Sequence, residues 1–267
     1  MKKSLILLVF LAYTAGCQQT ARRTDHIYAP LDSGKILQGQ TNFGRITAQG
    51  QDTTKCHIQA RLFAKAPTRR EAREILAQSQ AKLIAHESGL QVVIDHPKLP
   101  DNRSVGGDLT LELPTDCGID VQTDFGKIKV NNLYGGITAQ TDFGDIHCED
   151  IAGPVRLKTN FGKIKVRKVK SQNLSLDSDF GSLYLIYTAD TPNPMEGHLS
   201  TDFGKITVYL PESYSGHING STDFGSVRSL RPLQVKGHID KEKLDGHIGT
   251  GDSHVTAQTD FGSVRIH

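Results

Sequence analysis

The carboxylates of a repeated tetrapeptide are the residues of this chain whose spacing could do chemistry. The motif TDFG, with the variants TNFG and SDFG, occurs eight times, beginning at residues 41, 123, 141, 159, 178, 201, 222 and 259. Carboxylates stacked about 5 Å apart could bind calcium, which prefers oxygen ligands. However, Asn42 and Asn160 interrupt the series, and each copy supplies a single acid. Capping of a local turn by the side chain, an Asx-turn, is therefore the favoured role. The acids concerned are Asp124, Asp142, Asp179, Asp202, Asp223 and Asp260.

Histidines are the second residue type that could bind a metal. Gly-His pairs occur at 197–198, 216–217, 237–238 and 246–247, and His254 follows. Pairs on neighbouring repeats could hold a transition metal. Their offsets from the nearest motif differ, so the sequence predicts that most do not share a column, and it predicts no metal site. No G-x-S-x-G, H-E-x-x-H, P-loop or C-x-x-C occurs, so no catalytic residue and no cofactor are predicted.

Basic residues follow the motif glycine at alternating positions. Lys127, Lys129, Lys163 and Lys165 are expected on an outward sheet face, near Arg167 and Lys168. The favoured interpretation is a solvated face whose charges prevent lateral aggregation. The alternative is a binding strip for acidic polysaccharide or anionic lipid head groups. With 31 Lys and Arg against 29 Asp and Glu, the net charge of +2 indicates no nucleic-acid partner.

The spacing of the motif indicates the elements that position these residues. From Thr123 it recurs after 18, 18, 19, 23, 21 and 37 residues, and LDGHI at 244–248 reads as a degraded copy in the long gap. Apolar residues alternate on both sides of each copy, which predicts one strand before it and one after. The sequence therefore predicts an all-β parallel β-solenoid (β-helix) of about 18–20 residues per coil, with one helix.

Each residue of the motif has an expected structural role. Glycine supplies a positive φ or permits close approach of the next coil, and threonine or serine forms a hydroxyl ladder. Phenylalanine stacks on itself from coil to coil and closes one edge of the core. The predicted repeat corners are Gly44, Gly126, Gly144, Gly162, Gly181, Gly204, Gly225, Gly262, Phe125, Phe143 and Phe161.

The N-terminus has the layout of an export signal. Lys2 and Lys3 precede a short apolar run, and TAGC ends at Cys17. Residues 1–16 are predicted to be a lipoprotein signal peptide, Cys17 to be lipidated, and 17–33 to be a flexible tether. An ordinary signal peptide is the alternative. Among the other cysteines, Cys56 and Cys117 are the candidate disulfide pair, and Cys148 is expected to be a buried apolar residue.

Residues 51–113 interrupt the repeats. A helix is predicted within 67–89, capped by Thr68 and Glu71 and ended by Gly89, and strands are predicted at 56–64, 90–96 and 108–114. This segment is expected to cover one open end of the coils. Residues 34–267 are thus predicted to be a single domain, with repeat coils over 118–267.

The early T-x-F-G-x-I turn, the helix, LTLELP and the later T-x-F-G-x-I repeats resemble the bacterial "putative adhesin" family of unknown function, over residues 33–267. They resemble auto-transporter-adhesin-head-like domains more loosely. The resemblance implies an exported β-solenoid at a cell surface or in the envelope, and no catalytic residue.

We therefore expect a non-enzymatic, exported and lipid-anchored protein with an adhesin-like, structural or scaffolding role. It would lie at the cell membrane or outer membrane, facing the periplasm or the cell surface. Expected partners are the membrane, through the anchor, and envelope polysaccharide or another surface protein. The alternatives are a polysaccharide-binding or polysaccharide-cleaving module and an accessory component of envelope-stress signalling.

Overall fold

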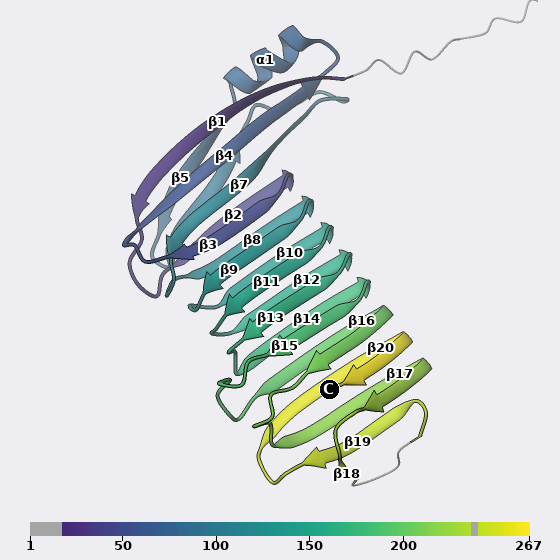
Figure 1. The fold of residues 1–267 in the computed structure, drawn as a ribbon. Coiled ribbons are helices and arrows are strands. Elements are labelled where there is room, and N and C mark those ends of the chain that lie inside the picture. Colours follow the sequence, from purple (N-terminus) through teal and green to yellow (C-terminus); the bar gives the residue numbers. More distant parts are fainter. Residues whose placement is uncertain (1–17, 236–239) are drawn as a thin grey trace, which may run out of the picture.

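The computed structural model describes residues 18–235 and 240–267, which form strands and a single helix (Figure 1). The expected all-β class with one helix is confirmed. The elements are β1 (Gln19–Pro30), β2 (Ile36–Phe43), β3 (Ile46–Gln51), β4 (Lys55–Ala66), α1 (Arg69–Ala77), β5 (Gln80–His86), β6 (Gly89–Asp95), β7 (Ser104–Pro114), β8 (Gly118–Phe125), β9 (Ile128–Leu133), β10 (Ile137–Phe143), β11 (Ile146–Ile151), β12 (Val155–Phe161), β13 (Ile164–Val169), β14 (Asn173–Phe180), β15 (Leu183–Tyr187), β16 (Glu196–Tyr209), β17 (Gly216–Ser229), β18 (Gln234–Val235), β19 (Lys243–Ile248) and β20 (Ser253–Ile266).

The repeats form two rows of parallel strands (Figure 1). β8, β10, β12 and β14 pair in one row, and β9, β11, β13 and β15 pair in the other. β16, β20 and β17 contribute to both rows, because each continues through its motif without a break. Alternate residues such as Ile119, Val121, Ile128 and Val130 are buried and belong to one hydrophobic core. Period-two burial on both sides of the motif thus confirms the predicted strands.

Motif residues lie directly opposite one another in neighbouring repeats. Thr123 pairs with Thr141, and Thr141 with Thr159, and the phenylalanines follow the same register. The core side of each strand is therefore fixed, because a slip of one residue would turn every apolar side chain outward.

The C-terminal strand departs from the expected order. β20 pairs with β16 on one side and with β17 on the other, so the copy at 259 lies between those at 201 and 222 (Figure 1). Residues 244–248, expected as a degraded repeat, instead lie in β19, which runs antiparallel to β17. Identical TDFGSVR segments at 222–228 and 259–265 allow either strand to match its neighbours in register, so motif spacing could not reveal this order.

The end of the molecule near the N-terminus is antiparallel. β7 joins β3 in parallel, after which β4 and β1 add antiparallel strands; β6 joins β2, and β5 pairs antiparallel with β6. The sheet is therefore mixed, parallel between repeats and antiparallel at both ends, and not parallel throughout as expected.

The predicted helix is shorter than expected. α1 ends at Ala77, and residues 80–86 form β5, so a helix over 67–89 is wrong for its second half. The predicted start is confirmed, since the Thr68 hydroxyl accepts a hydrogen bond from the Glu71 N–H at 3.2 Å. Gly89 has a φ of +147° and opens β6, where a Cβ would lie 2.0 Å from the carbonyl oxygen of Ile36. Gly89 therefore follows the turn of the β5–β6 hairpin and does not end a helix.

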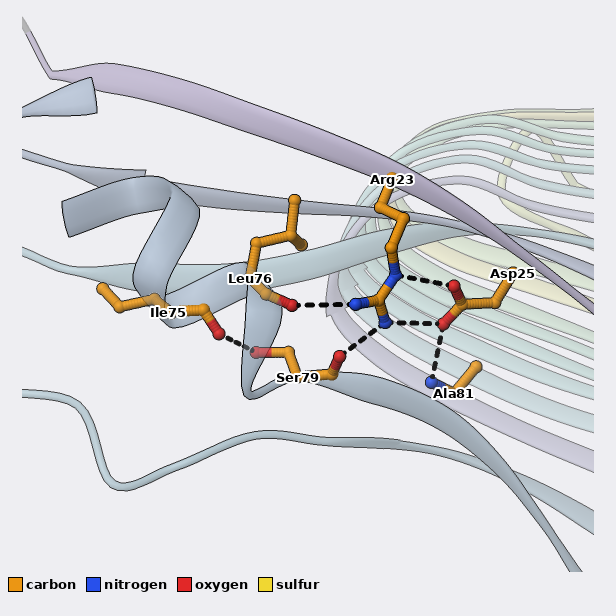
Figure 2. Close-up of polar contacts among 6 residues, drawn as sticks. All are labelled: Arg23, Asp25, Ile75, Leu76, Ser79 and Ala81. Carbon is orange, nitrogen blue, oxygen red and sulfur yellow. Dashed lines mark hydrogen bonds and ion pairs between the residues drawn. The ribbon is translucent and has the colours of Figure 1, made fainter. Parts of the chain in front are cut away.

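Arg23 of β1 holds the C-terminal end of α1 (Figure 2). Its guanidinium donates to the Leu76 carbonyl oxygen at 3.1 Å, which also accepts from the Ser79 N–H, and to the Ser79 carbonyl oxygen at 2.6 Å, just beyond the helix end. It also forms a bidentate ion pair with Asp25, whose carboxylate accepts a hydrogen bond from the Ala81 N–H. The Arg23 guanidinium holds the pKa of Asp25 below its usual value. One side chain thus fastens the helix and the start of β5 to β1.

The expected tether is wrong for residues 19–30. These residues form β1 and pair with β4 along its full length, with Ile27 opposite Ile58. Alternate half-buried side chains explain the strand, although its polar composition suggested an aperiodic linker. Residues 1–16 and Cys17, predicted to be signal peptide and lipidation site, lie outside the described residues. Within 18–235 and 240–267, no helix is long and apolar enough to span a membrane.

Cys56, Cys117 and Cys148 are all buried and free, so the candidate pair Cys56–Cys117 is not formed. The thiol of Cys117 instead donates to the Asp32 carbonyl at 3.2 Å. Complete burial raises the pKa of Cys148 to about 12, consistent with its predicted core position.

Candidate functional site

The motif phenylalanines form a continuous edge along the repeats, which we call the phenylalanine edge. Neighbouring rings stack with centroids 4.7–5.2 Å apart and interplanar angles of 1–9°. In spatial order it comprises Phe43, Phe125, Phe143, Phe161, Phe180, Phe203, Phe261 and Phe224. Each ring is 39–66% exposed. The predicted stack is present, but it does not close the core, because the rings stand outside it.

The stacking decides what this edge can bind. Each inner ring has both faces covered by its neighbours, so the exposed atoms are ring edges, which carry the positive part of the quadrupole. A sugar ring packs on an aromatic face, and only the outer faces of the two terminal rings, Phe43 and Phe224, lack a phenylalanine neighbour. The edge is therefore poorly suited to stacking along a glycan chain.

Threonine and glycine of the motif form a connected unit. The Thr141 hydroxyl donates to the Gly126 carbonyl at 3.1 Å, and Thr159 donates to Gly144 at 3.0 Å. A Cβ at Gly144 would lie 1.9 Å from the Gly126 oxygen, so glycine is required for close approach. Of the eight predicted corner glycines, Gly44 alone has a positive φ, +147°. The expected hydroxyl ladder is replaced by hydroxyl-to-carbonyl bonds between neighbouring repeats.

The motif aspartates do not form the expected Asx-turns. Among the described residues, no backbone N–H donates to one of their carboxylates. They face one another instead: Asn160 donates to Asp142 at 3.3 Å, and partial burial, with the carboxylates of Asp260 and Asp179, raises the pKa of Asp202. No three His, Cys, Asp or Glu side chains of the described residues are placed to hold a metal ion.

The predicted basic strip divides into two columns. Lys127 forms an ion pair with Asp145 at 3.0 Å, and the backbone N–H of Lys163 donates to the same carboxylate. Lys129 and Lys165 lie opposite His147 from either side and make no ion pair within the described residues. The structure therefore brings Lys129 and Lys165 together and leaves Lys127 neutralised by its neighbour.

Lys129, His147, Lys165 and Arg167 surround a shallow hollow of about 300 Å³, which we call the basic hollow. Lys165 and Arg167 also lie over the ring of Tyr184, at 5.7 and 5.9 Å from its centroid. Burial, with the charges of Lys127, Lys165 and Lys129, lowers the pKa of His147, against the opposing effect of Asp145. The hollow thus concentrates positive charge on a rigid strand surface, where it could bind an anionic group.

The expectation that most of the late histidines do not share a column is wrong for His217, His247 and His254. His254 lies opposite His217, and His217 lies opposite His247. The insertion of β20 and the reversed direction of β19 produce this row, and neither is visible in the offsets from the motif. His238 lies outside the described residues.

A second hollow, of about 620 Å³, lies on the outer face of the first row. Its lining includes Arg156 of β12, Ser175 of β14, Glu196 and His198 of β16 and His254 of β20, so four neighbouring strands contribute to it. The sequence does not reveal this hollow, because its alternating pattern marks outward positions but not the strand order that brings them together.

Comparison with known proteins gives structural resemblance alone. No family model matches the sequence, and no curated protein matches it significantly. A "putative adhesin" from Bacteroides fragilis NCTC 9343 is 14% identical, with 92% of this chain and 97% of that chain covered and a TM-score of 0.49. A "putative cell adhesion protein" from Clostridium sporogenes ATCC 15579 is 14% identical (91% and 99% covered, TM-score 0.39). A "putative adhesin" from Parabacteroides distasonis ATCC 8503 is 9% identical (94% and 98% covered, TM-score 0.41). The chain is similar to these structures over most of its length, and none of them assigns it a binding residue.

Proposed function

We propose that this chain is an exported, lipid-anchored β-solenoid that acts as a non-enzymatic, adhesin-like binding protein of the bacterial envelope. Its ligand is an acidic polysaccharide, bound at the basic hollow. The observation that carries the proposal is the placement of Lys129 and Lys165 on either side of His147, with Arg167 beside them, and neither lysine forms an ion pair with any described residue.

The form of the hollow favours binding over catalysis. It is shallow and lies on the outer face of regular strands, so a long polymer can cross it without entering a cleft. Its one acid, Glu149, is ion-paired with Lys168 at 2.9 Å. Glycoside cleavage commonly requires two carboxyl groups flanking the bond, and this hollow supplies one that is already engaged.

The anchor would set the orientation of the molecule. Only Gln18 separates Cys17 from β1, so lipidation at Cys17 would place the α1 end against the membrane. Arg22, Arg69 and Arg73 border a hollow of about 580 Å³ at that end. Such a surface suits anionic head groups, each basic side chain near the bilayer contributing about 1 kcal/mol. The basic hollow, which β4, β7 and β3 separate from β1, would then be held clear of the bilayer.

The test is binding of the chain to immobilised polysaccharides. We expect a uronic-acid polysaccharide to bind more tightly than neutral dextran, with affinity falling as salt rises. The double variant Lys129→Ser/Lys165→Ser should bind at least about tenfold more weakly, which corresponds to about 1.4 kcal/mol. Lys82→Ser/Lys158→Ser is the matched control, because it changes the net charge equally on β5 and β12, which do not line the basic hollow.

Equal weakening in both double variants would indicate a general charge effect and contradict a defined site. Absence of binding to any acidic polysaccharide would reject the proposed ligand. The anchor is tested separately: Cys17→Ser should release the protein from membranes, and continued membrane association would exclude lipidation as the means of attachment.

A further inference from the structure

The row of histidines at the β17 end of the molecule points to a metal site. In this row His254 of β20 lies opposite His217 of β17, and His217 lies opposite His247 of β19. The three strands are neighbours in Figure 1. The Nδ1 atoms of His217 and His254 are 3.3 Å apart. Two nitrogen ligands of a tetrahedral zinc ion, each about 2.0–2.1 Å from the metal, are separated by about 3.3–3.4 Å. The separation of these two nitrogens therefore matches that of ligands to one ion.

Hydrogen bonds at Nε2 of His217 and His247 leave the Nδ1 atoms of these rings available to a metal ion. Nε2 of His217 lies 2.6 Å from a carboxylate oxygen of Asp245, and Nε2 of His247 lies 3.2 Å from the Gly251 carbonyl oxygen. Both oxygens can only accept, so in the neutral rings each Nε2 carries the proton and each Nδ1 presents a lone pair. The second ring nitrogen of His254 lies 3.1 Å from the Thr256 hydroxyl, which can accept or donate. A carboxylate or carbonyl behind a ligating histidine is the usual support of a zinc site.

The orientation of the rings differs between the His217–His254 pair and the His26–His57 pair. The rings of His217 and His254 are tilted by 36°, so lone pairs in their planes can converge. The rings of His26 and His57 are stacked with an interplanar angle of 10°, and their facing nitrogens are 3.0 Å apart, the length of an ordinary N–H···N hydrogen bond. The geometry of the His26–His57 pair is therefore that of a hydrogen bond between the rings and not that of two ligands to one ion.

We propose that His217 and His254 bind a zinc-class divalent ion through Nδ1, with His247 as third ligand and water completing the shell. The centroids of the His217 and His247 rings are 6.0 Å apart. No three ligand side chains of the described residues converge as they stand, so the His247 ring must turn toward the pair and release its hydrogen bond to the Gly251 carbonyl. Asp245 positions His217 and does not touch the metal. Imidazole nitrogen favours Zn²⁺, Ni²⁺ or Cu²⁺ over Ca²⁺.

Titration calorimetry of the full chain with Zn²⁺ alone tests this site. One zinc ion is expected per chain, and Ca²⁺ should give no heat of binding at these residues. His217→Gln and His254→Gln should abolish binding, while His247→Gln and the positioning variant Asp245→Asn should weaken it by about tenfold or more. His57→Gln is the matched control and should bind zinc as the unaltered chain does.

Three results would overturn the proposal. They are the absence of stoichiometric zinc binding, unaltered zinc affinity in any of the three histidine variants, or loss of binding in His57→Gln. Far-UV circular dichroism of each variant without zinc distinguishes loss of a ligand from loss of the fold, since these histidines lie on the outer face of their strands.

Discussion

The hydroxyl of Thr141 donates to the carbonyl oxygen of Gly126 at 3.1 Å, and that same oxygen lies too close to the position that a Cβ at residue 144 would take. The Cβ would be 1.9 Å from the oxygen and 2.7 Å from the carbonyl carbon. Both atoms belong to the backbone of the neighbouring repeat and cannot move without separating the strands. We expect Gly144→Ala to lower the free energy of unfolding by about 3 kcal/mol, measured by urea denaturation.

Gly39→Ala is the control for that substitution. A Cβ at Gly39 would meet only side-chain carbons of Leu109, Val121 and Leu111, at 3.7–3.8 Å. Alanine there should be neutral or stabilise the fold by up to about 1 kcal/mol, because it restricts the unfolded chain. Similar losses at both positions would show that close approach does not explain the motif glycine.

The threonine of the motif should depend on its hydroxyl more than on its shape. Thr141→Val keeps the volume but removes the donor to Gly126, and should cost about 1–2 kcal/mol. Thr141→Ser keeps the donor and loses one methyl group, so it should cost about 0.8 kcal/mol. Ser178 already occupies the equivalent motif position and donates to the Gly162 carbonyl. In urea denaturation, a valine variant more stable than the serine variant would contradict the assigned role.

Stacking should contribute more stability at the interior rings of the phenylalanine edge than at its terminal rings. Phe161 stacks on Phe143 and Phe180, with centroids 5.0 and 4.9 Å away, whereas Phe224 stacks on Phe261 alone and is 66% exposed. We expect Phe161→Ala to cost about 2 kcal/mol and Phe224→Ala about 1 kcal/mol. Thermal unfolding of both variants checks the order, and an equal or reversed order would rule out stacking between rings as its cause.

Local pattern predicted much of the repeat region. Period-two alternation gave the strands on both sides of each motif, and the recurrence of phenylalanine predicted its stack. The basic residues Lys129 and Lys165 could be placed on one face because an unbroken parallel register preserves their offset from the motif. These features depend on neighbours in sequence or on one constant spacing.

Features that depend on strand order could not be predicted. β20, and not β17, pairs with β16. Both strands contain the same TDFGSVR segment, so the sequence does not indicate which of them lies next to β16. The row of His254, His217 and His247 depends on that order. β1 was missed for a related reason: its partner β4 supplies the buried face, so its own polar residues give a weak signal.

The three cysteines of the described residues should be unreactive in the folded protein. Cys56, Cys117 and Cys148 are fully buried, and burial raises the pKa of each thiol, in the case of Cys148 to about 12. Because the thiolate is the reactive form, a maleimide at pH 7 should label none of them until urea unfolds the chain. Peptide mapping by mass spectrometry reads each cysteine separately. Rapid labelling of Cys148 before unfolding would contradict its place in the core.

Arg23 should stabilise the docking of α1. Arg23→Ala removes the donors to the carbonyls of Leu76 and Ser79 and the ion pair with Asp25, and should cost about 1–2 kcal/mol. Arg23→Lys should recover only part of this, since an ammonium cannot reproduce the planar fork of the guanidinium. Hydrogen exchange should show the loss in α1 and β5, whereas β8 to β15 should keep their protection. Uniform loss over all strands would contradict a local role.

Asp25 gives that docking a defined pH dependence. Arg23 lowers the pKa of Asp25 in the folded protein, and the Ala81 N–H adds to the effect, so the carboxylate stabilises the fold in its charged form. This contribution is complete above the ordinary aspartate pKa, about 3.9, and is lost as the pH falls through the lower folded-state value. Asp25→Asn should therefore be less stable than the unaltered chain at pH 7, and the difference should shrink as the pH approaches 2. Urea denaturation across that range measures it, with Asp120→Asn, an exposed aspartate of β8, as the control. A difference that persists at pH 2 would show that the charge of Asp25 is not what holds α1 to β1.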